Sequence, residues 1–243
     1  MKNSCPKYAQ SGLTLIELMI AMLLGVFLIG GVVQIFVSSK QTYRMQEGLS
    51  RLQENGRFAM DFISRDLRMA GYREINVANY TQCLNYTVPS PITGVDDTGL
   101  NGSDTISLQL SPSVCTGVPV PITITYSIQP GVGGRPGLQK ATNPVDANSD
   151  GELVEDVENM QILYGDDANG DFTPDYYVPF GTPGLNMARV VSIRVSLLLR
   201  SSENLAAQPL PYNFNGVTIT PAATDRTIRR VFTSTIALRN RLS

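Results

Sequence analysis

The first strong pattern along the chain is an apolar run near its N-terminus. Residues 13–37 are apolar or small almost throughout, and a helix of about 25 residues can cross a ~30 Å hydrocarbon layer. Apolar positions then recur at three- and four-residue steps as far as Leu67, with charged residues between them. Gly71 is typical of a helix end. The pattern therefore predicts one helix from Leu13 to about Met69, with its first half in lipid or a filament core.

The period changes from residue 72 onward. Apolar and polar side chains alternate there, as they do in half-buried strands, and clusters of Gly, Pro, Asn and Asp separate the alternating segments. The predicted strands are residues 104–111, 121–129, 158–165, 189–201 and 229–240. We therefore expect an α+β fold, in which the long N-terminal α-helix packs on an antiparallel β-sheet head.

Composition excludes several classes of function. The 19 basic and 21 acidic residues nearly balance, so nucleic acid is not indicated as a partner. The chain contains no histidine, which removes the usual general base and the commonest zinc ligand. Catalytic motifs such as G-x-S-x-G and the P-loop do not occur. We predict no catalytic residues and no enzyme, and a membrane-anchored enzyme is only a remote alternative.

The three cysteines predict one disulfide. Cys5 precedes the apolar run, so removal of a leader there would leave the pair Cys83 and Cys115. An even pair in an exported protein usually forms a bridge, which here would close a loop of about 30 residues and contribute ~3 kcal/mol. Two buried free thiols are the alternative, and no C-x-x-C pattern indicates metal or redox chemistry.

Glu17 is the unusual residue of the apolar run, because a bilayer penalises charge. A secretory signal does not fit, since the run is too long and no A-x-A cleavage site follows it. A plain membrane anchor explains the length, and Lys2 and Lys7 favour a cytoplasmic N-terminus. A plain anchor does not explain the acid.

The stretch SGLTLIEL, which contains Gly12, Leu13 and Glu17, resembles the N-terminal signal of type IV prepilins. The resemblance implies that a prepilin peptidase cuts between Gly12 and Leu13, that Leu13 is N-methylated, and that Glu17 becomes the fifth mature residue. Many members carry Phe where this chain has Leu13. In lipid, the new α-amine of one subunit and the Glu17 carboxylate of a neighbour would relieve each other's desolvation cost. An interface-facing Glu that reaches the membrane surface is the alternative.

Three late segments resemble PilW-type minor pilins of type IV pilus machinery. They begin VENMQILYGDD, ARVVSIRVSLL and RRVFTSTIALR, whereas residues 76–143 carry no recognised motif. The resemblance implies three parts: a leader (1–12), a transmembrane and amphipathic long helix (13–70) and a periplasmic β-rich head (71–243). It also implies an inner-membrane protein with a cytoplasmic N-terminus that later joins a pilus at the cell surface.

The implied function is assembly of a type IV pilus, in a priming or tip complex that supports adhesion, twitching motility or DNA uptake. The implied partners are other minor and major pilins, the prepilin peptidase, the inner membrane and a pilus-tip adhesin. A type II secretion pseudopilin of the J type is the alternative within the same superfamily.

Two acidic loops raise the question of a metal cofactor. Residues 146–152 open like an EF-hand loop but lack the required Glu at the twelfth position, and we interpret them as a turn. The second loop places oxygen ligands at alternating positions typical of Ca²⁺ sites. The hypothesis of calcium binding rests on Asp167, Asn169, Asp171 and Asp175.

Overall fold

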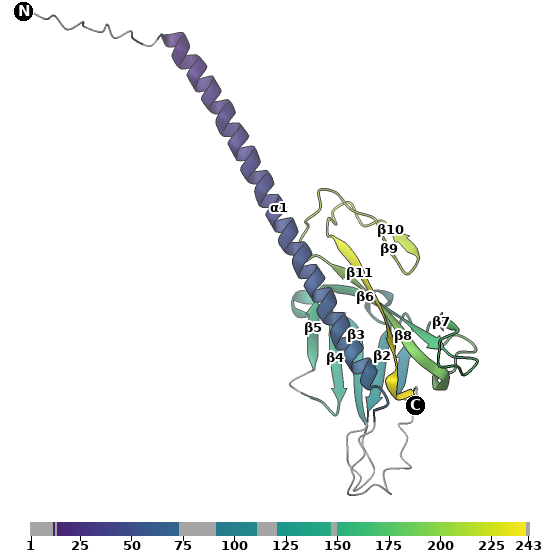
Figure 1. Ribbon diagram of the computed structural model, residues 1–243. Helices are drawn as coiled ribbons and strands as arrows, with labels where there is room; N and C mark the ends of the chain where they lie inside the picture. Colours follow the sequence, from purple (N-terminus) through teal and green to yellow (C-terminus); the bar gives the residue numbers. More distant parts are fainter. Residues whose placement is uncertain (1–11, 13, 73–90, 111–120, 147–149, 242–243) are drawn as a thin grey trace, which may run out of the picture. The chain divides into compact units, whose positions relative to one another are not determined.

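The computed structural model describes residues 12, 14–72, 91–110, 121–146 and 150–241 (Figure 1). The chain forms two compact units, residues 1–46 and 47–243. Helix α1 (Leu15–Met69) begins in the first unit and ends in the second. The long helix that the sequence predicts from Leu13 is therefore confirmed over Leu15–Met69.

The first half of α1 buries almost none of its own surface. The large apolar side chains of residues 15–37 are exposed, from 79% at Leu15 to 44% at Val37. An 18-residue window of this helix has a mean hydropathy of 2.6 and is long and apolar enough to cross a membrane. In water such a surface is unfavourable, because each large apolar side chain loses about 1.5–3 kcal/mol relative to burial.

The second half of α1 presents one buried stripe, as its apolar periodicity predicts. The buried positions are spaced by three or four residues, so they lie on one helix face. They are Leu52, Gly56, Ala59, Ile63 and Leu67. The side chains in this stripe join the hydrophobic core of the head.

The first sheet of the head is a five-stranded antiparallel meander in which neighbours in sequence are neighbours in space. Its strands are β1 (Ile92–Val95), β2 (Thr105–Leu110), β3 (Ile122–Pro130), β4 (Pro136–Asn143) and β5 (Gly151–Glu155). Short 3-10 turns η2 (Leu100–Gly102) and η3 (Val132–Gly134) lie in the β1–β2 and β3–β4 connections.

The second sheet has four antiparallel strands in the order β11-β8-β6-β7, and a separate hairpin joins β9 and β10. The strands are β6 (Val157–Asp166), β7 (Tyr176–Val178), β8 (Val190–Arg200), β9 (Tyr212–Phe214), β10 (Val217–Ile219) and β11 (Arg229–Ala237). The turns η4 (Met187–Arg189) and η5 (Arg239–Arg241) precede β8 and follow β11.

The structure confirms the α+β fold and all five predicted strands, which correspond to β2, β3, β6, β8 and β11. It divides the antiparallel head into two main sheets and adds strands that the alternation pattern did not show. Strand β4 is an example, because its sequence PGLQKATN has no regular alternation of apolar residues. Its place in the sheet depends on pairing with β3 and β5.

A hydrogen bond and an ion pair connect α1 with the first sheet. The Tyr126 hydroxyl on β3 donates a hydrogen bond of 2.5 Å to Asp66 of α1, and Lys140 on β4 lies 3.2 Å from the same carboxylate. Tyr126 is fully buried, and burial together with the Asp66 bond raises its pKa. Asp66 therefore contacts the head, although its charge suggests the polar face of the helix.

A chain of ion pairs links the ends of several strands. Asp156, the single residue between β5 and β6, is 3% exposed and pairs with Arg135 and with Arg200 of β8. Arg200 also lies 3.4 Å from Glu158 of β6, and Glu158 binds Arg229 of β11 at 2.6 Å.

The last acid in this series of ion pairs is Asp225, which pairs with Arg229 at 2.6 Å. The Arg229 side chain holds the pKa of Asp225 down at about 2. Arg229 itself is only 7% exposed at its side chain, so its two acids compensate its desolvation. The ion pairs thus connect the first sheet, through Asp156, with the second.

We predict that Asp156→Asn destabilises the protein. Asp156 has a φ of 62°, a left-handed conformation that Asn tolerates, so the substitution removes the charge without new backbone strain. Two arginines would lose a buried partner, at a cost of about 2–4 kcal/mol. Denaturant unfolding of the detergent-solubilised chain measures the change.

Glu47→Gln is the matched control for this prediction, because Glu47 forms an exposed i,i+4 pair with Arg51. Loss of that pair should change stability by less than about 0.5 kcal/mol. Equal effects of the two substitutions would contradict a special role for Asp156.

We also predict that Gly56→Val destabilises the packing of α1 on β11. A Cβ atom at Gly56 would meet the ring of Phe232, which is partly buried against the core. Overpacking of this kind costs about 1–3 kcal/mol. The double variant with Phe232→Leu should recover part of the loss in the same unfolding measurement, and an undiminished loss would show that the ring is not the cause.

Candidate assembly site

The acid near the start of α1 belongs to a helix cap. The Thr14 hydroxyl oxygen accepts a hydrogen bond from the Glu17 backbone N–H at 3.3 Å. In return, Glu17 Oε2 accepts bonds from the Thr14 backbone N–H at 3.1 Å and from the Thr14 hydroxyl at 3.0 Å. This reciprocal arrangement is a capping box, which satisfies two backbone donors at the head of a helix.

The capping box was absent from the sequence-based interpretation of Glu17. Its signal is present in the sequence, because T-L-I-E matches the pattern S/T-x-x-E that precedes an apolar helix. Both described bonds to the Glu17 carboxylate involve the Oε2 atom, and the Glu17 side chain is exposed. Within the described residues, Oε1 therefore has capacity to accept a bond from another group.

The predicted processing residues flank this cap. Gly12 is exposed, and a Cβ atom built on it would meet nothing within 4 Å. Leu13, the predicted new N-terminus, lies outside the described residues. Cleavage and methylation at this bond remain predictions.

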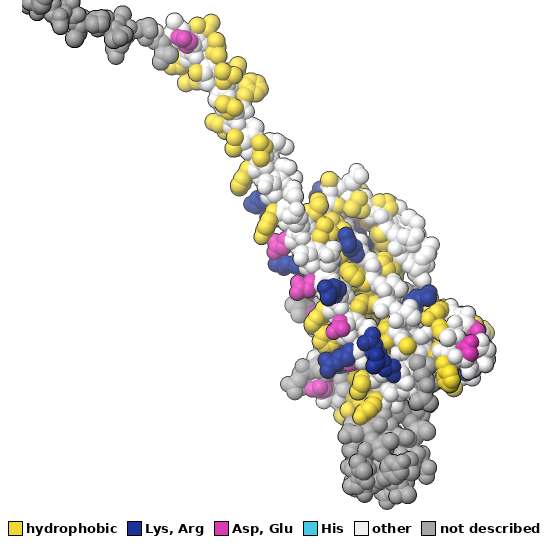
Figure 2. Space-filling model, in the orientation of Figure 1, with side chains coloured by type: hydrophobic (Ala, Val, Ile, Leu, Met, Phe, Trp, Pro, Cys, Tyr) yellow, Lys and Arg dark blue, Asp and Glu magenta, His cyan; other side chains and the backbone are white. Residues whose placement is uncertain are grey.

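The apolar surface beyond the cap is continuous. Hydrophobic side chains cover the first part of α1 in Figure 2, whereas basic and acidic side chains intermingle over the head. The one charged residue within residues 15–37 is Glu17. This half of the helix therefore offers a surface for lipid or for other apolar helices, with one acid at its beginning.

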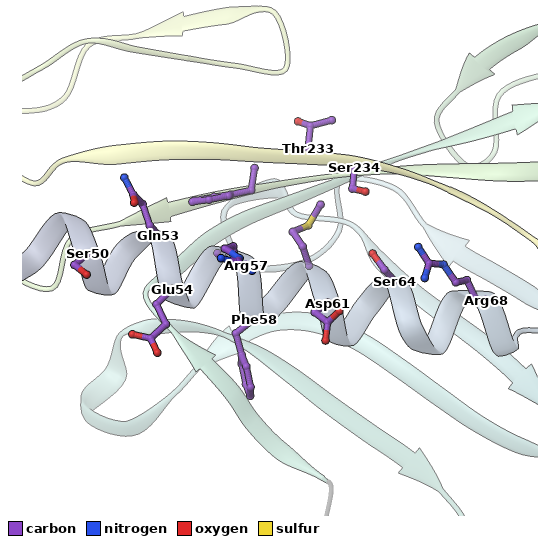
Figure 3. A pocket seen from close by; sticks show the side chains of 13 residues that line it. Ser50, Gln53, Glu54, Arg57, Phe58, Asp61, Ser64, Arg68, Thr233 and Ser234 are labelled. Atoms are coloured by element: carbon purple, nitrogen blue, oxygen red, sulfur yellow. The ribbon is translucent and has the colours of Figure 1, made fainter.

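The head carries an open groove between α1 and β11, with a volume of about 1010 Å³ (Figure 3). Charged side chains of α1 such as Glu54, Arg57 and Asp61 line it, together with Phe232 of β11. Strand β11 pairs with β8 alone among the described strands, so its other edge is unpaired there. Groups of this kind can bind another chain, but they form no catalytic arrangement that we recognise.

The second acidic loop has a well-defined internal network. Asp167 accepts bonds from the backbone N–H groups of Gly170, Asp171 and Phe172. The remaining predicted ligands behave in the same way. Asn169 accepts a bond from Asp171, Asp171 accepts bonds from Thr173, and Asp175 accepts bonds from Ala168 and Asn169. Donors within the loop therefore already use many of these oxygens, and calcium binding there remains an untested hypothesis.

The predicted disulfide partners cannot be placed. Cys83 and Cys115 both lie outside the described residues. Their pairing therefore stays a prediction from the cysteine count.

Comparisons with known proteins find family matches in the N-terminal part and in the C-terminal half of the chain. Residues 125–240 match the family described as "Type IV Pilus-assembly protein W", and residues 7–33 match the "Prokaryotic N-terminal methylation motif". The first match covers β4 to β11, and the second covers the cap and most of the apolar run.

One curated relative is the pilin-like protein PilA3 of Thermus thermophilus. It is 32% identical over 97 residues, which is 40% of this chain and 40% of the relative's length. Among solved structures, a type IV-like pilin from the same organism matches with a TM-score of 0.45 and 12% identity. That match covers 78% of this chain and 98% of the other, and a likeness so distant says nothing about function.

The matched pilus-assembly family is structural rather than catalytic. They suggest interaction with other pilins, and the methylation motif with the apolar helix suggests anchoring in a membrane. The two family matches and the pilin-like relative together support a type IV pilus minor pilin of the PilW type, with a prepilin-like N-terminal signal.

Proposed function

We propose that this minor pilin takes part in assembly of a type IV pilus, as a subunit of a priming or tip complex that supports adhesion, twitching motility or DNA uptake. The observation that carries the proposal is the exposed apolar half of α1 with one capped acid at its head. A surface of this kind needs partners outside the chain, and the family matches indicate other pilins as those partners.

The proposed maturation begins in the inner membrane. Residues 1–12 form the leader, the prepilin peptidase cuts between Gly12 and Leu13, and Leu13 becomes N-methylated. The N-terminus faces the cytoplasm and the head faces the periplasm before assembly, and the subunit reaches the cell surface in the pilus. The methylation motif over residues 7–33 supports this processing.

Glu17 is proposed to contact the α-amine of Leu13 in a neighbouring subunit. The capping box uses Oε2, so Oε1 can accept a bond from that amine while the cap persists. In an apolar medium the two charges lower each other's desolvation cost, which favours one axial register over others. Glu17 would thus act in the helix cap and in assembly.

The finer partners follow from the same proposal. They are other minor pilins, the major pilin, the prepilin peptidase and a pilus-tip adhesin. We also propose the Cys83–Cys115 disulfide in the periplasmic head, an oxidising setting that favours such bonds.

We predict that Glu17→Ala and Thr14→Ala have different effects on pilus incorporation. Both substitutions break the capping box, at a cost of about 1 kcal/mol to the helix start. Only Glu17→Ala also removes the proposed partner of the α-amine, so incorporation should fall about tenfold or more, as a lost charge pair of over 1.4 kcal/mol implies. Immunoblotting of sheared pili against total membranes measures the ratio.

Thr14→Ala is the matched control and should retain most incorporation. Equal, small losses in the two variants would leave Glu17 with a capping role alone. Equal, large losses would assign the defect to the cap and contradict the proposed intersubunit pair.

We further predict that deletion of the gene reduces surface pili and twitching motility, because a priming complex would lack a subunit. Protein export by type II secretion should be unchanged. Loss of secretion with normal pili would indicate the J-type pseudopilin function and contradict the proposed one.

A further inference from the structure

Three aspartates gather in the connection between β1 and β2. Asp96 and Asp97 follow β1, and Asp104 immediately precedes β2. One carboxylate oxygen from each lies within 4.8 Å of those of the other two. Asp104 is 3% exposed, whereas Asp96 is partly exposed and Asp97 is exposed.

The hydrogen-bond donors that face these carboxylates are neutral. Asp104 accepts bonds from the backbone N–H groups of Asp97 at 2.9 Å and Ile162 at 2.6 Å. The Gln161 amide donates to Asp97 at 3.2 Å. None of the salt bridges between described residues involves the three acids. Their mutual repulsion is therefore uncompensated by any described basic side chain.

The electrostatic consequence is visible in the pKa values. Burial raises the pKa of Asp104 to about 6, although the two backbone donors act in the opposite direction. Burial and the neighbouring Asp97 also raise the pKa of Asp96.

Two buried hydroxyl groups, one in the β1–β2 connection and one next to strand β1, lack hydrogen-bond partners among the described residues. The Tyr164 side chain on β6 is 1% exposed, and its hydroxyl is unpaired. That hydroxyl lies against Gly94, two residues before Asp96. Burial, and then the Asp104 and Asp96 carboxylates, raise the pKa of Tyr164.

Ser103 is the second case. Its side chain is fully buried, its hydroxyl has no partner among the described residues, and it lies against Gly99 in the same connection. Buried hydroxyl groups without partners are rare, because each loses its bonds to water. The Tyr164 hydroxyl and the three carboxylates are therefore oxygen atoms that a bound species could satisfy, and the Ser103 hydroxyl is a further unpaired group in the same connection.

We propose that Asp96, Asp97 and Asp104, near the unpaired Tyr164 hydroxyl, bind a calcium ion in the head. Hard cations prefer oxygen ligands, and Ca²⁺ accepts six to eight of them at about 2.3–2.6 Å in flexible geometry. Two oxygens on opposite sides of Ca²⁺ are thus roughly 4.6–5.2 Å apart, and the 4.8 Å limit on these carboxylates allows one ion to contact all three. The smaller Mg²⁺ binds oxygens at about 2.0–2.1 Å and demands near-octahedral geometry, which a flexible loop meets less readily.

The ion would join parts of the head that are distant in sequence. Asp104 already binds the backbone of Ile162 in β6, 58 positions away, and Tyr164 belongs to the same strand. Calcium would therefore hold the β1–β2 connection of the first sheet against the second sheet. This inference is independent of the proposed role in pilus assembly.

We predict that the full-length chain binds one Ca²⁺ ion per chain at pH 7.5. The chain would be solubilised in detergent, freed of metal with a chelator and titrated with CaCl₂. Isothermal titration calorimetry should give a dissociation constant of about 10⁻⁵–10⁻³ M, the range of sensor and extracellular sites. The thermal unfolding midpoint should rise when CaCl₂ is added and return when EDTA is added, because the ion binds the folded state alone.

Asp97→Asn tests the site without disturbing the buried part, since Asp97 is exposed. Its affinity for calcium should fall at least tenfold, with folding intact by circular dichroism. Asp171→Asn is the matched control from the other acidic loop and should bind as the unsubstituted chain does.

Three results would overturn the proposal. The first is the absence of both calorimetric heat and a calcium-dependent shift in the unfolding midpoint, which would leave a shared proton or a water at the three acids. The second is unchanged affinity in Asp97→Asn. The third is loss of binding in Asp171→Asn alone, which would place the ion in the second loop.

Discussion

An apolar helix surface that its own chain does not cover is the constraint on which the rest of this protein depends. Residues 15–37 expose nearly every large side chain, and the hydrophobic effect disfavours such a surface in water. A bilayer can cover it, and so can similar helices in a filament. Membrane anchoring and association with other pilins would therefore use the same surface, the apolar half of α1.

Glu17 is the one charged residue on this apolar surface, and it lies at the beginning of the helix. Dispersion and apolar contacts between helices depend little on axial position, whereas a charge in a medium of low dielectric has a strong preference for one partner. The capping box fixes the carboxylate at the head of the helix through Thr14, next to the position of the predicted new amine. The cap thus explains why the acid is held in place, and the proposed amine explains why an acid is tolerated in lipid.

The sequence predicted the elements whose patterns are regular and local. Helix α1 and strands such as β8 and β11 follow from the periodicity of apolar and polar residues in their sequences. Strand β4 has no such pattern and is defined by its neighbours in the sheet. The capping box could have been found from T-L-I-E, but the contact of Asp104 with Ile162 joins residues 58 positions apart and is visible only in the fold.

Mass spectrometry of the N-terminus of this subunit, purified from pili or membranes, tests most directly whether the apolar helix is a processed pilin helix. The predicted result is a terminal peptide that begins with N-methylated Leu13, since cleavage after Gly12 creates the amine that Glu17 would meet. Recovery of an intact chain that begins at Met1 would contradict this and leave a plain membrane anchor.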